Sequence, residues 1–121
     1  MKRALFLILL LPGLALAHTF TFTWTDPTQR TDGSAITAAE LKSYRLQCSG
    51  PENAERIVDR AATSAVGTER RYEWADAVQI SGMYDCRMTA IDSGDRESDW
   101  SNTASVPKFA APSAPTDLRG Q

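Results

Sequence analysis

A strict two-residue alternation of aromatic and threonine side chains over residues 19–25 constrains the fold more than any other feature. Phe20, Phe22 and Trp24 occupy the even positions, and every odd position is threonine. Successive side chains of a β-strand point to opposite faces. The segment therefore predicts a strand with its three aromatic rings buried and its hydroxyl groups in water.

Five further segments have strand patterns. Residues 41–48 and 84–90 alternate apolar and polar side chains, and shorter candidates cover residues 56–59, 71–74 and 103–106. Turn residues rich in glycine, proline and aspartate lie between them, which predicts an all-β sandwich. One segment differs: Thr37 and Glu40 have the spacing of a capping box and predict a single helical turn.

Residues 1–17 have the features of a secretory signal peptide. Lys2 and Arg3 precede an apolar run, and a small-x-small sequence ends at Ala17, so we expect the mature chain to begin at His18. A membrane-spanning helix is the alternative, but Pro12 interrupts the run, which falls short of the roughly 20 residues a span requires. The segment predicts a secreted or periplasmic protein with no membrane span after cleavage.

The charge of the chain argues against polyanionic partners. It carries 13 basic and 15 acidic side chains, a formal net charge of −2, and the predicted cleavage removes two of the basic ones. Proteins that bind nucleic acid need clustered cations to displace counterions from phosphate, and no such cluster is present in the sequence. We therefore expect no nucleic-acid partner.

An ordered set of motifs extends over almost the whole predicted mature chain. The set comprises Phe22-Thr-Trp24-Thr-Asp-Pro27, Asp32-Gly33-Ser34, Ser43-Tyr44-Arg45-Leu46, Val78 six residues before Tyr84, an alternating run from Tyr84 to Asp92, and Glu97-Ser98-Asp99-Trp100-Ser101-Asn102. Their order and spacing resemble a fibronectin type III domain of the bacterial kind. The resemblance implies an immunoglobulin-like β-sandwich over residues 18–108, followed by a proline-containing tail at residues 109–121.

The resemblance also implies roles for particular aromatic residues. Trp24 would lie on the second strand, B, at the centre of the core, and Tyr44 on strand C. Tyr84 would begin strand F, where its hydroxyl reaches a backbone group near the preceding turn. The core predicted in this way comprises Phe22, Trp24, Tyr44, Leu46, Tyr84 and Met88.

The two cysteines fall on inward positions of strands that the resemblance makes antiparallel neighbours, C and F. The corresponding register pairs Cys48 with Cys86, Leu46 with Met88 and Tyr44 with Ala90. Because an exported chain meets oxidising conditions, this arrangement predicts a disulfide, worth about 4 kcal/mol for a loop of this length. The alternative is a pair of buried free thiols that pack as small apolar groups.

The resemblance is incomplete at its start. A type III domain has a first strand, A, beside strand B, and the predicted cleavage leaves no residues to form it, so strand B would be a sheet edge. The tail resembles an interdomain linker or the first strand of a following domain, with Leu118 as its apolar anchor. One hypothesis is that residues 112–119 pair with strand B of another copy. The alternatives are a disordered tail or a fragment of a longer multi-domain protein.

No catalytic motif stands out. With a single histidine, His18, the chain offers no base for serine or cysteine nucleophiles, so we expect no enzyme activity and no cofactor. The prediction is a non-catalytic binding or spacer module with a protein or glycan partner. A copper-binding protein that uses N-terminal His18 is one alternative, although a redox copper centre would need a second imidazole.

A carbohydrate-binding accessory module is a second alternative. It would use Trp100 as an exposed contact, whereas in the other interpretation this ring packs over the strand ends. The acidic residues of the same loop are Asp92, Asp95, Glu97 and Asp99. Their spacing differs from that of a calcium-binding loop, so we expect a solvated acidic turn.

Overall fold

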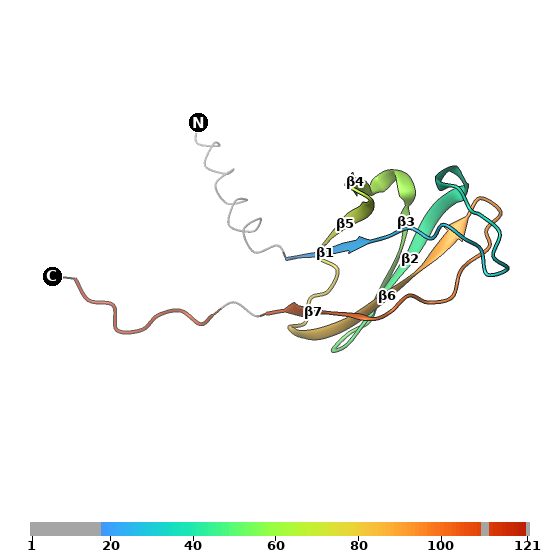
Figure 1. The fold of residues 1–121 in the computed structure, drawn as a ribbon. Helices are drawn as coiled ribbons and strands as arrows, with labels where there is room; N and C mark the ends of the chain where they lie inside the picture. The colour runs from blue at the N-terminus through green and yellow to red at the C-terminus, as the bar shows by residue number, and fades with distance from the viewer. Residues whose placement is uncertain (1–17, 110–111, 121) are drawn as a thin grey trace, which may run out of the picture.

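Two antiparallel β-sheets face each other in the computed structural model, which describes residues 18–109 and 112–120 (Figure 1). The predicted signal peptide, residues 1–17, lies outside the described residues. The elements in chain order are β1 (Thr19–Trp24), the 3₁₀ helix η1 (Ala38–Glu40), β2 (Leu41–Ser49), β3 (Ala54–Asp59), the 3₁₀ helix η2 (Arg60–Ala62), β4 (Ser64–Val66), β5 (Glu69–Ala75), β6 (Gly82–Asp92) and β7 (Ala104–Lys108).

One sheet has the strand order β1-β5-β4, and the other has the order β3-β2-β6-β7. All strand pairs are antiparallel. The predicted all-β, two-sheet sandwich is therefore confirmed. The short strand β4 has no alternating pattern of its own, and the sequence analysis missed it. The helical turn is η1, where the Glu40 carboxylate accepts the backbone N–H of Thr37 at 2.9 Å, as the capping box predicts.

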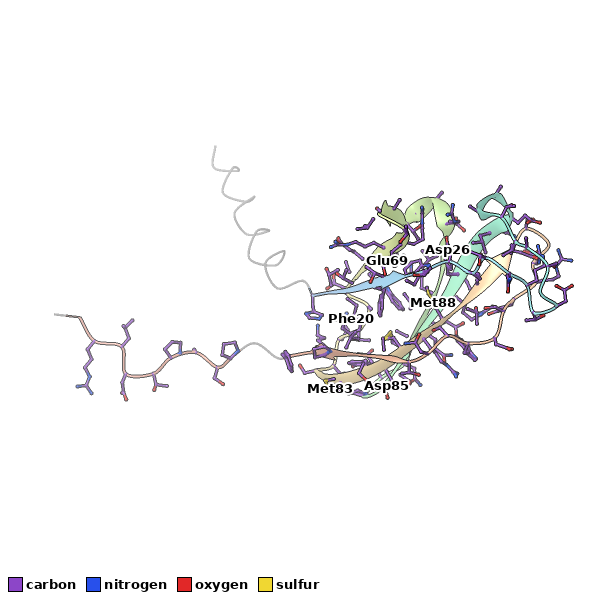
Figure 2. All side chains as sticks on the ribbon, viewed as in Figure 1. Phe20, Asp26, Glu69, Met83, Asp85 and Met88 are labelled. Atoms are coloured by element: carbon purple, nitrogen blue, oxygen red, sulfur yellow. A yellow bond between two sulfur atoms is a disulfide. The ribbon has the colours of Figure 1, made fainter. Side chains whose placement is uncertain are left out.

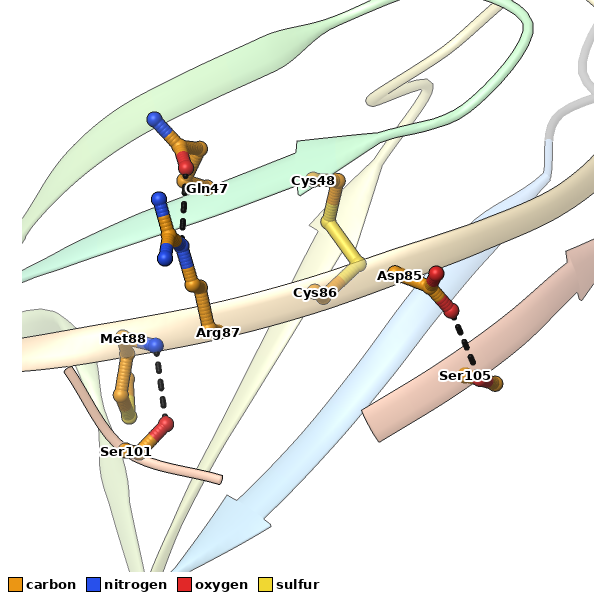
Figure 3. The surroundings of a disulfide bond; sticks show 8 residues. All are labelled: Gln47, Cys48, Asp85, Cys86, Arg87, Met88, Ser101 and Ser105. Atoms are coloured by element: carbon orange, nitrogen blue, oxygen red, sulfur yellow. Dashed lines mark hydrogen bonds between the residues drawn. A yellow bond between two sulfur atoms is a disulfide. The ribbon is translucent and has the colours of Figure 1, made fainter. Parts of the chain in front are cut away.

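The central register of the four-stranded sheet agrees with the prediction. Strands β2 and β6 pair Tyr44 with Ala90, Leu46 with Met88 and Cys48 with Cys86. The two cysteines form a disulfide between these strands, with their Cα atoms 4.0 Å apart (Figure 3). Since both cysteines are bonded to each other, the alternative of free thiols is wrong.

The buried core lies between the sheets on both sides of this disulfide. Its fully packed members are Phe20, Leu46, Cys48, Trp74, Val78, Tyr84 and Cys86. The Tyr84 hydroxyl donates a hydrogen bond to the Ile80 carbonyl in the turn before β6, which is the corner contact that the resemblance implies. Burial raises the pKa of this hydroxyl above its ordinary value.

The tryptophan in the core is Trp74, whereas the resemblance placed Trp24 at the centre. Strand β5, which carries Trp74, lies between β1 and β4, while β1 is at the edge of its sheet. An edge strand has a neighbour on one side only, so its side chains are less completely covered. Phe20 is buried, but Phe22 and Trp24 are only half-buried, and the expectation of three buried rings on this strand is wrong.

Three of the other predicted core residues, Tyr44, Leu46 and Tyr84, are buried. Met88 is half-buried on β6 and packs against the core cluster. Figure 2 labels Phe20 and Met88, which lie in the space between the sheets. The half-buried residues Phe22, Trp24 and Met88 therefore define one side of the sandwich that is less covered than the rest.

Candidate interaction surface

Four strands lie at sheet edges, and three of them have features that discourage pairing with another chain. Strand β3 contains the charged residues Glu55, Arg56 and Asp59, β4 has only three residues, and β7 contains Pro107 and ends at Lys108. Charges, short length and proline are the usual means by which exposed strand edges avoid association.

Strand β1 has none of these features. Its six residues include no charged residue and no proline, and it pairs regularly with β5 from Thr19 to Trp24 without a bulge. Within residues 18–109 and 112–120, no strand pairs with its other edge. The outward side chains of Thr19, Thr21 and Thr23 are exposed. Strand β1 is therefore the unprotected edge of the sandwich.

A hollow of about 90 Å³ lies on the inner side of this edge, between β1 and β6. Phe22 and Trp24 line it from β1, Met88 and Cys86 line it from β6, and Ala104 closes it from β7. The lining is mostly apolar, which suits a small or branched aliphatic side chain. An additional strand beside β1 would direct alternate side chains into this hollow.

The opposite rim of the hollow already has its hydrogen bonds. The Ser101 hydroxyl accepts the backbone N–H of Met88 at 3.0 Å (Figure 3). Farther along β6, outside the hollow, the Ser98 hydroxyl accepts the backbone N–H of Ala90 at 2.9 Å. The backbone N–H groups of the two serines donate in turn to the carbonyls of Met88 and Ala90, each at 2.8 Å. Beside the hollow, the backbone groups that can still pair with an added strand are therefore those on the outer edge of β1.

The end of β1 is fixed to the rest of the sandwich through Asp26. This carboxylate accepts hydrogen bonds from the Tyr44 hydroxyl, from the Trp24 indole at 3.2 Å and from Arg60 at 3.2 Å. Burial and the Asp26 carboxylate together raise the pKa of Tyr44 above its ordinary value. The Trp24 ring also packs edge to face on Tyr44, with centroids 4.9 Å apart. The edge strand is therefore held in place before any partner binds.

The acidic segment at the end of β6 is solvated at Asp95, Glu97 and Asp99, as predicted, but not at Asp92. Asp92 is only 3% exposed, and its carboxylate accepts hydrogen bonds from Arg30 at 2.7 Å and from the Arg96 side chain at 2.9 Å. The Arg30 contact is the main reason that the pKa of Asp92 lies well below its usual range. Glu97 similarly binds Arg45 at 2.7 Å and Thr89 at 2.6 Å. Asp92 therefore ties the segment that contains Arg30 to the end of β6, and Glu97 ties the loop after β6 to strands β2 and β6.

A second hollow, of about 360 Å³, lies at this loop end of the sandwich. Arg30, Asp92, Arg96 and Glu97 contribute charge to its lining. Each of the four is already in an ion pair within the protein, and a fifth charged lining residue, Asp32, accepts hydrogen bonds from Ser34. We interpret this region as a structural link between the loop that contains Arg30 and the loop after β6. Binding a charged ligand there would require these ion pairs to break.

His18 lies at the start of β1. Its ring contacts Phe20 edge to face, with centroids 5.4 Å apart, and its backbone nitrogen lies 3.4 Å from the Asp76 carboxylate. Nowhere in the described ranges do three or more histidine, cysteine, aspartate or glutamate residues form a group able to hold a metal ion. The geometry adds nothing in favour of the copper alternative.

Trp100 is 37% exposed and lies beside the outer face of the four-stranded sheet. The guanidinium of Arg87 sits 4.0 Å from its ring centroid. Arg87 donates to Gln47 at 3.1 Å, and Gln47 donates to Glu55 at 3.1 Å, which forms a polar ladder across β6, β2 and β3. One face of the exposed ring is therefore covered by a cation of the protein itself.

The fold and the edge together define an antiparallel β-sandwich with one unprotected strand beside an apolar opening. No helix in the described part of the chain is long and apolar enough to cross a membrane. Comparisons of the chain with models of protein families, with curated proteins and with solved structures found no match.

Proposed function

We propose that this protein is a secreted or periplasmic binding module of the fibronectin type III kind, without catalytic activity, which takes its partner as an added strand on β1. The observation that carries the proposal is the contrast between β1 and the three protected edges. An uncharged edge of six residues has backbone groups available for pairing.

Strand addition has a simple physical basis at this edge. Main-chain hydrogen bonds to the added strand provide affinity, and pockets for its alternate side chains provide specificity. Here the hollow beside Phe22, Trp24 and Met88 is such a pocket. Covering these half-buried groups removes apolar surface from water, at about 25 cal/mol for each Å².

Three features support the type III assignment. The first is the register of β2 with β6, and the second is the hydrogen bond from the Tyr84 hydroxyl to Ile80. The third is the strand order, which places β1 with β5 and β2 with β6. The cross-strand disulfide is an addition to the family pattern and, with the predicted signal peptide, supports an oxidising location.

We do not extend the proposal to glycans. A sugar ring stacks on the face of an exposed aromatic side chain, and the Arg87 guanidinium already covers one face of Trp100. The polar groups of the neighbouring ladder are also bonded to one another.

The proposal is tested by titrating the mature protein with extended peptides of about ten residues that alternate threonine and valine. Backbone amides of residues 19–24 and the indole N–H of Trp24 should shift in two-dimensional NMR spectra. The amides around Asp92, at the loop end of the sandwich, serve as internal controls and should stay in place. Peptides that leave the β1 amides unshifted, or that shift only the loop end, would refute the proposal.

A further inference from the structure

We infer that the strand received by β1 is supplied by a second copy of this chain, through its residues 112–120. The inference rests on the proposed function, because it takes β1 as the binding edge and names the occupant. It joins two features of the structure that nothing else explains, an unprotected edge and an exposed extended tail.

The described tail segment, residues 112–120, is not packed against its own domain. Residues 112–120 form no secondary structure, and all of them are exposed. Leu118 is 94% exposed, the highest value among the large apolar side chains of the described residues. A strand rises about 3.4 Å per residue, so this segment is long enough to cover the six residues of β1.

The side chains of the tail suit an added edge strand. If Leu118 faces the hollow, the two-residue period places Ala114 and Thr116 on the same face, which offers small groups and one larger aliphatic group. Pro115 then falls on the outer face, and because proline has no N–H to donate, the tail pairs in the register in which the backbone groups of Ala114, Thr116 and Leu118 face β1. The added strand becomes the new edge, and proline is a usual protective residue at a sheet edge.

One residue of the tail must change conformation. Asp117 has a φ of +57°, in the left-handed region that is less favourable than extended backbone for residues other than glycine. Pairing with β1 returns this residue to an extended conformation, so docking straightens the segment immediately before Leu118.

The direction of the chain favours a second copy over the tail's own domain. Strand β1 begins and β7 ends at the same end of the sandwich, and the tail continues away from that end (Figure 1). Turned back on its own domain, the tail would run parallel to β1, although every strand pair of the structure is antiparallel. The tail of a second copy approaches from the other end and pairs antiparallel.

The contact uses two different surfaces, the edge of one copy and the tail of the next. Each added copy therefore still offers one unused edge and one unused tail, so copies continue to add unless the rotation between neighbours closes them into a ring. The expected assembly grows with protein concentration.

Two variants of the mature full-length protein separate the two surfaces. Leu118→Asp removes the apolar anchor of the tail, with Leu118→Met as its matched control. Phe22→Lys places a charge at the hollow and blocks the edge, with Phe22→Leu as its control. Because Leu118 makes no packing contact in a single copy, Leu118→Asp leaves the domain folded and decides the inference even if Phe22→Lys is unstable.

Sedimentation velocity over a wide concentration range is the readout. The wild type and the two control variants should form species that grow with concentration, whereas Leu118→Asp and Phe22→Lys should each remain single copies. An equimolar mixture of the two blocked variants should stop at pairs, of about twice the single-chain mass, because one open edge meets one intact tail.

A wild type that remains a single copy at every concentration, or a Leu118→Asp variant that assembles like the wild type, would overturn the inference. The proposed function is decided separately by the peptide titration. If the peptides bind β1 but the tail does not, only the identity of the occupant is wrong. If neither binds, both proposals fail.

Discussion

Removal of the disulfide between Cys48 and Cys86 gives a quantitative test of how the sandwich is stabilised. The two cysteines are 38 positions apart in the sequence. Closing a loop of this length removes enough conformational entropy from the unfolded chain to stabilise the fold by about 4 kcal/mol. Folded domains have a total unfolding free energy of about 5–15 kcal/mol, so the loss should be a large fraction of the total.

Two double variants separate the loss of the cross-link from the loss of packing. Replacing both cysteines by alanine removes the cross-link and also leaves space in the core, because both residues are buried. Replacing both by valine keeps most of the apolar volume. In urea denaturation at pH 7, the valine pair should lose about 4 kcal/mol of unfolding free energy and the alanine pair more. A loss below about 1 kcal/mol in both variants would refute the reasoning.

Three further predictions concern fold contacts. In Gly50→Ala the new Cβ would lie 2.6 Å from the Met83 carbonyl oxygen, so urea denaturation should show a loss of about 1–3 kcal/mol, whereas Gly120→Ala, with nothing within 4 Å, should be neutral. Tyr44→Phe removes one of the three donors to Asp26 and should cost about 1 kcal/mol. Asp92 has a lowered pKa in the folded state, so its stabilising contribution is complete above the unfolded pKa of about 4 and is lost as the pH falls below it. Asp92→Asn should therefore reduce the acid dependence of the urea midpoint.

Each of these predictions has a result that contradicts it. Equal stabilities of the two glycine variants would mean that the backbone around Gly50 moves freely. An unchanged Tyr44→Phe variant would mean that water replaces the hydroxyl at Asp26. An Asp92→Asn variant with the same loss of stability at low pH as the wild type would mean that other carboxylates govern acid unfolding.

Much of the fold follows from local patterns in the sequence. Period-two alternation predicts the strands, and the resemblance to a type III domain makes β2 and β6 antiparallel neighbours. Keeping inward residues opposite inward residues then leaves few registers for this pair. The observed pairing of Leu46 with Met88 is one of them. The capping box of Thr37 and Glu40 is also a local interaction within four residues. These predictions succeed because the interacting groups lie close in sequence or share one periodic face.

Other features depend on contacts between distant residues and could not be predicted. Arg30 lies 62 positions from Asp92, so nothing near Asp92 in the sequence indicates that its carboxylate is buried and paired. Trp74 rather than Trp24 is buried in the core because β5, not β1, is the middle strand of its sheet. The alternation of side chains does not specify this strand order.

The candidate site was predictable in part. The absence of charge and proline in residues 19–24 already indicates an unprotected strand. The hollow beside it required the structure, because it arises between Met88 on one sheet and Phe22 on the other. Ser98 and Ser101 belong to one of the motifs that carry the resemblance, but the hydrogen bonds between their hydroxyls and the backbone of β6 could be seen only in the structure.

The central claim is that the edge of β1 is covered by the tail of another copy. Hydrogen–deuterium exchange of the wild-type protein at increasing concentration tests this claim directly, since it reports on both partners at once. Amides of residues 19–24 on the outer edge and amides of residues 113–119 should become protected together as the concentration rises. Tail amides that exchange rapidly at every concentration, whether or not β1 becomes protected, would contradict it.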